Sequence, residues 1–147
     1  MIRVSVFNAH RRHRIRKAPV RGYVREALRG RRIASADIAV IVIDNRYCRR
    51  LNWNYLRHSG ATDVIAFTLE RSQTLEGEIY VNMDRARSQA RTYRVPIANE
   101  LARLVIHGAL HLAGEDDATA RARRTMRALE DAALARFFEG PHSRRNR

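Results

Sequence analysis

Two histidines in the C-terminal half of the chain have a spacing that suits a metal ion. His107 and His111 are four residues apart, so on a helix their imidazoles lie on one face. That geometry suits two ligands of one tetrahedral ion. Gly114 allows the chain to turn sharply after the pair, and Asp117 can then fold back as a third ligand. Two nitrogens and one carboxylate oxygen leave a fourth position open, which is typical of a catalytic zinc site.

Other roles for the same residues remain open. Asp116 competes with Asp117 for the third position, because an aspartate beside a helix end also serves as a cap. The two histidines could instead form hydrogen bonds on a helix that packs against a sheet, with no metal. The pair alone is a weak signal, whereas the glycine and aspartate at fixed offsets make the pattern specific. Gly108 stands where metalloproteases of the H-E-x-x-H type carry a glutamate base, which argues against peptide hydrolysis.

The metal pattern falls within a predicted helix. Pro96 is suited to a first helical turn, and apolar residues then recur at spacings of three and four until Gly114. The two histidines therefore lie in the second half of this helix. A further helix begins near Thr119 and carries a core stripe of apolar residues. Asp84 is expected to cap another helix, which ends near Arg94.

The N-terminal half of the chain shows strand patterns. Alternating or continuous runs of branched apolar residues predict four strands, near residues 2–6, 38–43, 64–67 and 79–81. A helix opened by Pro19 and ended by Gly30 separates the first two strands, and Asp44 caps a short helix after the second. The polar segment that contains Gly77 suits a hairpin connection between the last two. This order predicts an α+β fold in which a small mixed sheet packs against helices.

Positive charge dominates the composition. The 147 residues contain 29 Lys and Arg against 15 Asp and Glu, a formal net charge of +14, and Lys17 is the only lysine. The basic residues gather in three places: residues 10–17, the tail at 143–147, and the helical positions Arg121, Arg123, Arg124 and Arg127. Such patches neutralise phosphates and bind nucleic acid without sequence preference. A GC-rich coding sequence and a solvated basic surface would explain the same arginines.

The rest of the composition bounds the class of protein. No stretch reaches the roughly 18 to 20 consecutive apolar residues that cross a bilayer, so no membrane association is expected. Cys48 is the only cysteine, which excludes an intramolecular disulfide. The sequence has no glycine-rich phosphate loop, so no nucleotide cofactor is expected. We therefore expect a cytoplasmic protein with one domain over residues 1–140 and a basic, disordered tail at 141–147.

Two stretches of the sequence resemble the signatures of one family. Residues 107–117 resemble the H-G-x-L-H-L-x-G-x-x-H/D signature of the YbeY family, bacterial endoribonucleases that mature ribosomal RNA. Residues 51–67 look like the second signature of that family, and residues 77–79 are similar to its G-D-I strand. Most members have histidine at the third ligand position, where this chain, like a subset of the family, has Asp117. The resemblance covers about residues 37–135.

The resemblance implies a function and its partners. It implies a zinc-dependent, single-strand-specific endoribonuclease that matures the 3′ end of small-subunit ribosomal RNA and takes part in ribosome quality control. The expected partners are ribosomal RNA and the small ribosomal subunit. One Zn²⁺ per chain would be held by His107, His111 and Asp117. Two alternatives are a non-catalytic, zinc-containing factor for ribosome assembly and, less favoured by Gly108, a metalloprotease.

The chain departs from the family pattern at one position of functional weight. Many relatives have arginine directly after the aromatic residue of the second signature, and here that position is Leu56, followed by Arg57. Phosphate contacts are therefore expected from Arg57 or from Arg103, which lies one turn before the first histidine. If the loop at 56–63 lines the cleft, the candidates for catalysis are His58, Asp63 and Arg57.

Overall fold

A four-stranded mixed sheet forms the base of the molecule. The structure is a computed structural model that describes residues 1–56, 62–71 and 73–140. Its strands are β1 (Ile2–Asn8), β2 (Ala36–Ile43), β3 (Val64–Glu70) and β4 (Leu75–Asn82). They lie in the order β1-β2-β4-β3, with β1, β2 and β4 parallel and β3 antiparallel to β4. The predicted mixed sheet and hairpin are confirmed.

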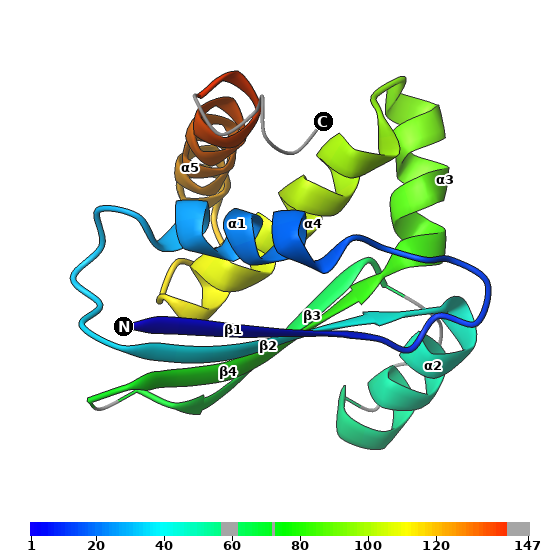
Figure 1. Ribbon diagram of the computed structural model, residues 1–147, viewed down its shortest axis with the longest axis horizontal. Coiled ribbons are helices and arrows are strands. Elements are labelled where there is room, and N and C mark those ends of the chain that lie inside the picture. Colours follow the sequence, from blue (N-terminus) through cyan, green and yellow to red (C-terminus); the bar gives the residue numbers. More distant parts are fainter. Residues whose placement is uncertain (57–61, 72, 141–147) are drawn as a thin grey trace.

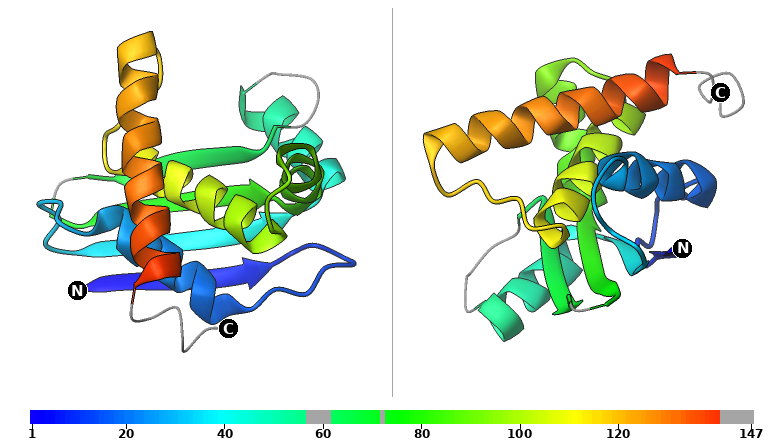
Figure 2. Two further views of the ribbon diagram at one scale, coloured as in Figure 1. Left: turned by 90° about the horizontal axis from the view of Figure 1, so that it is seen from above. Right: turned by 90° about the vertical axis from the view of Figure 1, so that its left-hand side faces the viewer.

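Helices cover the two faces of the sheet unequally (Figure 1). On one face lie α1 (Lys17–Leu28), α3 (Met83–Tyr93) and α4 (Ile97–Leu112), and α5 (Ala120–Glu139) crosses over α1 and α4 as the outermost layer (Figure 2). The other face carries α2 (Asn45–Leu51) and a short π-helical segment at Asn52–Leu56. The expected α+β architecture is therefore confirmed, and the family-signature helix α4 lies at its centre.

Alternation along the strands explains why most helices gather on one face. Val6, Val40, Ile79 and Ala66 stand side by side across the four strands and point toward α4. Together with apolar residues of α1, α3, α4 and α5 they form the main core. A smaller cluster around Ile43 lies under α2 on the opposite face. Burying these apolar surfaces is the main force that fixes the layers.

Two glycines allow α4 to lie unusually close to the sheet. A Cβ atom at Gly108 would lie 2.7 Å from a methyl group of Ile79, and one at Gly77 would lie 2.7 Å from a methyl group of Leu112. Both distances are far shorter than a normal carbon–carbon contact. Gly77 lies within β4, which begins at Leu75, so the prediction that it lies in the hairpin connection is wrong. The close packing fixes the height of α4 above the strands.

The helix after the hairpin has a different cap from the expected one. The side chain of Asn82, not that of Asp84, accepts the backbone N–H groups of Asp84 and Arg85 at 3.1 and 3.2 Å. Asn82 is the last residue of β4 and the helix begins at once, so the capping position falls two residues earlier than predicted. This frees the carboxylate of Asp84 for contacts with other elements.

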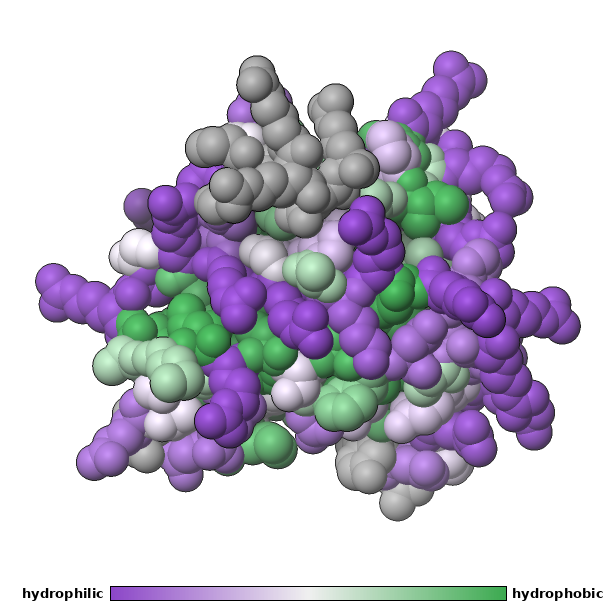
Figure 3. Space-filling model, viewed as in Figure 1, coloured by the Kyte–Doolittle hydropathy of each residue, from purple (hydrophilic) through white to green (hydrophobic). Residues whose placement is uncertain are grey.

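The surface is hydrophilic over most of the face seen in Figure 1. Figure 3 shows long hydrophilic side chains at its periphery and apolar side chains along the level of α1 and β1. In the described residues, none of the helices is long and apolar enough to span a membrane.

Candidate metal centre

The end of α4 and the turn that follows it position three side chains. Gly114 has φ of +106°, a value that glycine adopts without strain, and it ends the helix as predicted. Arg71 donates two hydrogen bonds to the carbonyl oxygen of Leu112 at the end of the helix, at 2.8 and 3.2 Å. This guanidinium stabilises the negative end of the helix. The chain then reverses and brings Asp117 back over His107 and His111.

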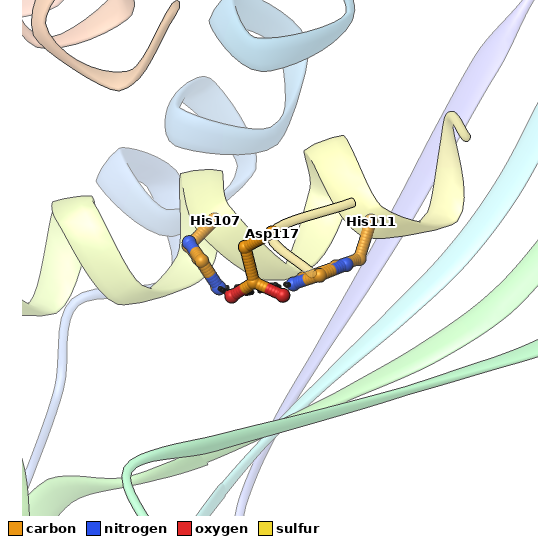
Figure 4. A group of neighbouring side chains, drawn as sticks. All are labelled: His107, His111 and Asp117. Atoms are coloured by element: carbon orange, nitrogen blue, oxygen red, sulfur yellow. Dashed lines mark hydrogen bonds and ion pairs between the residues drawn. The ribbon is translucent and has the colours of Figure 1, made fainter. Parts of the chain in front are cut away.

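The three side chains point toward one another (Figure 4). The Nε2 atoms of His107 and His111 lie 3.0 Å apart, and Oδ2 of Asp117 lies 3.6 and 3.7 Å from them. Two nitrogen ligands of one tetrahedral zinc ion are roughly 3.3 Å apart. Asp116 instead accepts the backbone N–H of Ala118 and so holds the turn. The geometry therefore selects Asp117, not Asp116, as the third member of the group.

A buried carboxylate on α5 orients the first histidine. Oε2 of Glu130 lies 2.6 Å from Nδ1 of His107, and only 8% of the glutamate side chain is exposed. Arg103 donates to the other oxygen of Glu130 at 2.9 Å and to Asp131 at 2.7 Å. With its proton on Nδ1, His107 presents the lone pair of Nε2 to the centre. A carboxylate behind a ligating histidine is the usual outer partner at zinc sites.

The pKa of His107 shows the balance between burial and its carboxylate neighbours. Burial alone lowers the pKa, because it disfavours the charged imidazolium. The hydrogen bond and charge of Glu130, followed by the charges of Asp117 and Asp63, outweigh burial and raise the pKa of His107 above its ordinary value. The surroundings thus favour positive charge at this point. A metal cation satisfies the same field.

The donor set fits a divalent metal of the zinc type. Two imidazole nitrogens and one carboxylate oxygen lie within 4.8 Å of one another. In the part of the chain that the structure describes, this is the one such group, and it offers three ligands where structural zinc sites have four. About half of the Asp117 side chain is exposed, so a substrate can reach the centre. An open arrangement with three protein ligands is typical of catalytic zinc sites.

The comparison with known proteins identifies the family. The sequence model of the family described as Endoribonuclease YbeY matches residues 6–138. The chain belongs to this family. The Endoribonuclease YbeY of Christiangramia forsetii is 33% identical over 122 residues, which cover 83% of this chain and 85% of the relative. That of Chlorobaculum parvum is 41% identical over 101 residues, 69% of this chain and 72% of the relative.

A solved structure agrees with the fold. The solution structure of TM1509 from Thermotoga maritima covers 97% of this chain at a TM-score of 0.62, and 95% of its own chain is matched at 23% identity. The match to the family model and the identity with the two relatives confirm the family expected from the two signatures. The enzyme class, a hydrolase that acts on RNA phosphodiester bonds, follows from membership in the YbeY family.

Two clefts meet at the first histidine of the YbeY signature. One, of about 470 Å³, is lined by all three members of the metal group together with the start of β3. The other, of about 560 Å³, extends from His107 between α3, α4 and α5. Asp63 lines both clefts, and its carboxylate accepts a hydrogen bond from Gln89 at 3.3 Å. The other catalytic candidates, Arg57 and His58, lie outside the described residues.

A third cleft carries positive charge. It has a volume of about 520 Å³ and is lined by His107, Asp117 and three exposed arginines of α5, namely Arg123, Arg124 and Arg127. Arg123 donates to the backbone oxygen of Asp117 at 3.4 Å. The basic helix face expected from the sequence therefore lies directly beside the metal group.

Two buried acidic residues of this region, Glu100 and Glu130, stand at positions that resemble the family pattern, but the sequence alone assigned no role to either. Glu130 stands within the apolar stripe of α5 formed by Met126, Ala133 and Phe137. A carboxylate at such a position needs a buried partner. Glu100 is buried in α4 and stands on the helix face that carries the histidines. Acidic residues inside an apolar stripe are thus the sign by which such partners can be found.

Proposed function

We propose that the chain is a zinc-dependent, single-strand-specific endoribonuclease that matures the 3′ end of small-subunit ribosomal RNA and contributes to ribosome quality control. The observation that carries the proposal is the open three-ligand group with a carboxylate behind His107. Its partners would be ribosomal RNA and the small ribosomal subunit, and its place of action the cytoplasm. The names of its YbeY relatives support the substrate class.

The protein side chains hold and orient the centre. His107, His111 and Asp117 would bind the ion, and Glu130 keeps the Nδ1 proton of His107 in place so that Nε2 stays available. A bound zinc ion supplies Lewis acidity and lowers the pKa of water to near neutrality. Asp117 adds a negative charge that a histidine at this position would lack, so the substitution changes metal affinity rather than removing the site.

Proton transfer falls to Asp63 among the described candidates. It lies at the junction of the two clefts that reach His107, and Gln89 fixes one of its oxygens. The water that attacks phosphorus loses a proton, which the Asp63 carboxylate would accept. As the bond from phosphorus to the leaving oxygen breaks, that oxygen would take a proton from the protonated Asp63 or from solvent, so that an alcohol leaves. From the sequence alone, His58 remains a further candidate for this step, and Arg57 remains a candidate for contacts with the phosphate.

Substrate phosphates would be bound by the arginines that surround the centre. Arg124 and Arg127 have no hydrogen bond or ion pair within the described residues, and both line the basic cleft beside His107. Arg103 is already engaged by Glu130 and Asp131, so its expected role in substrate binding would have to use its remaining N–H donors. Free guanidinium groups stabilise the charge that develops at phosphorus.

Gly108 bears on the metalloprotease alternative. Any side chain at this position would collide with Ile79 in the sheet, so the helix has no room for the glutamate base of that class. The exposed, three-ligand centre likewise disfavours a purely structural zinc ion. Neither observation favours a function other than RNA cleavage.

A pair of neighbouring aspartates provides the experiment. We expect the purified full-length chain to hold about one zinc ion and to cleave single-stranded RNA. Asp117→Ala should lose both properties, whereas Asp116→Ala, one residue away, should retain both, because Asp116 binds only the backbone of the turn. Metal analysis and cleavage of a labelled oligoribonucleotide measure the two properties. Zinc-loaded wild-type protein that leaves RNA intact would refute the proposal.

A further inference from the structure

The cleft between α3, α4 and α5 has several walls, among them Glu100, that have no role in the chemistry described above. It has a volume of about 560 Å³, within the usual range of roughly 300–1,000 Å³ for ligand pockets. Figure 1 shows α5 and α3 on either side of α4, and residues of all three helices line the cleft. His107 lines the cleft, as do Tyr93 and Val95 at the end of α3. A group that enters here therefore lies beside the metal centre.

Glu100 is the unusual residue of this cleft. It is only 4% exposed, yet no hydrogen bond to its side chain is formed within the described part of the chain. The other two carboxylates that line the cleft do have donors, since Gln89 binds Asp63, and Arg103 and His107 bind Glu130. Among the described residues, the carboxylate oxygens of Glu100 are not among the fully buried side-chain atoms without a partner, so they face the open cleft. A largely buried carboxylate without protein donors gains from a ligand that brings N–H groups.

Charged groups of both signs face Glu100, and burial has the largest effect on its pKa. Burial raises the pKa of its carboxyl group, Arg103 lowers it, and the charges of Asp63 and Glu130 raise it further. Arg127 lines the same cleft from α5. The net direction is upward, which is the expected sign for a carboxylate that lacks hydrogen bonds.

The remaining walls suit a flat, partly polar ring. Leu104, Leu134 and Val95 supply apolar surface, and the amide of Asn99 supplies both a donor and an acceptor. The side chain of Tyr93 is exposed at 62% of its surface and stands at the rim. Single-stranded RNA is recognised by stacking of its bases on aromatic side chains and by hydrogen bonds to the base edges. A nucleobase has this combination of apolar faces and polar edge.

We propose that this cleft binds the base of a nucleotide adjacent to the cleaved bond, and that Glu100 selects guanine. The inference rests on the proposed ribonuclease function and names the specificity of the same site. Guanine presents two neighbouring N–H donors, at N1 and at the 2-amino group, which match the two oxygens of one carboxylate. Uracil places a carbonyl oxygen on each side of its single N–H, and adenine and cytosine place an acceptor nitrogen beside their amino group.

The test compares guanosine with inosine, which lacks only the 2-amino group. The substrates are labelled uridine oligomers that contain one guanosine or one inosine, cleaved by the zinc-loaded full-length chain. We expect kcat/KM to be about tenfold higher for guanosine, cut next to that nucleotide, because a bidentate base contact discriminates by roughly that factor or more. Glu100→Gln, which has the same shape, should bring the ratio close to one. Equal cleavage of both oligomers by the wild type would overturn the proposal.

Controls separate this proposal from the proposed function. Glu76→Gln makes the same change at an exposed position of β4 outside the cleft, and the guanosine-to-inosine ratio should stay at the wild-type value. Thermal melts and zinc content show whether Glu100→Gln is folded. The same oligomers are also titrated with zinc-free protein by fluorescence anisotropy. Guanosine-dependent binding that Glu100→Gln removes supports the cleft even if no RNA is cut, and cleavage without base preference overturns the cleft alone.

Discussion

Two histidine–carboxylate pairs in this molecule differ in the use of the second ring nitrogen. In one, Glu130 holds Nδ1 of His107 at 2.6 Å, and Nε2 faces His111 and Asp117. In the other, Asp84 holds Nε2 of His10 at 2.8 Å. Nδ1 of His10 accepts the backbone N–H groups that follow it, those of Arg12 and His13, both at 3.1 Å. In the first pair the second ring nitrogen faces two other candidate metal ligands, whereas in the second pair it binds the backbone of the same segment.

The difference distinguishes a candidate metal site from a contact that only holds segments of the fold together. The side chain of His10 is 4% exposed and ties the segment after β1 to the first turn of α3. Asp84 also accepts the backbone N–H of Asn45 at 2.9 Å. Three segments far apart in sequence meet there. His107 instead belongs to a group of donors that converge on one point and remain open to solvent. Two similar histidine–carboxylate pairs therefore differ in role, because the second ring nitrogen faces candidate metal ligands in one pair and backbone N–H groups in the other.

Removing each histidine should give the largest contrast. His107→Ala removes a ligand, so zinc content and RNA cleavage should each fall by more than about a hundredfold, beyond the effect of a lost outer partner. His10→Ala should leave zinc content near the wild-type value and lower the free energy of unfolding by about 1–3 kcal/mol, because two N–H groups and a carboxylate lose their partner. Metal analysis and urea unfolding measure the two effects. Loss of zinc in His10→Ala would erase the distinction.

The carboxylate partners should show the same contrast at smaller amplitude. Glu130→Gln removes the charge behind His107 and should weaken zinc binding by about 10–100-fold. Asp84→Asn is the matched change at the other pair and should leave zinc affinity unaltered. A competition titration against a chromophoric zinc chelator measures both. Equal zinc affinity in wild type and Glu130→Gln would mean that Glu130 only packs the helices together.

Local geometry explains which parts of the site could be predicted from the sequence. His107 and His111 lie on one helix face and Gly114 adopts the positive φ that turns the chain, and both features follow from short-range rules. The spacing of the pattern favours Asp117 over Asp116, and the structure gives the physical reason, because the carboxylate of Asp116 accepts the backbone N–H of Ala118. The order of strands and helices could also be predicted, because apolar residues recur with a different period in a strand than in a helix.

Contacts between residues far apart in sequence explain the features that the sequence did not predict. Asn82 and Asp84 are both competent caps, and the choice depends on where β4 ends and on His10, which lies 74 residues away in sequence. Glu130 gains its meaning from His107, 23 residues earlier. No local pattern encodes such pairs. The predicted roles of Arg57 and His58 stay predictions, since both residues lie outside the described part of the chain.

The smallest effect expected is a pH dependence confined to the structural pair. Burial alone raises the pKa of Asp84, but the hydrogen bonds from His10 and from the backbone of Asn45 outweigh it and leave the pKa lowered. A carboxyl group whose pKa is lowered by folding stabilises the protein above its unfolded pKa, and this contribution disappears as the pH falls through the folded value. Wild type should therefore exceed Asp84→Asn in unfolding free energy by about 1 kcal/mol at pH 7.

The difference in unfolding free energy between wild type and Asp84→Asn should shrink once the pH falls below 3.8, the ordinary pKa of the Asp84 carboxyl group. Urea unfolding of both proteins between pH 7 and pH 3 measures it. A matched pair of unfolding curves for wild type and Glu76→Gln, whose carboxylate is exposed on β4, corrects for the loss of one negative charge. If the difference between wild type and Asp84→Asn is the same at every pH, the carboxylate is not the acceptor that joins β1 to α3. The contrast between the two histidine pairs would then rest on His10 alone.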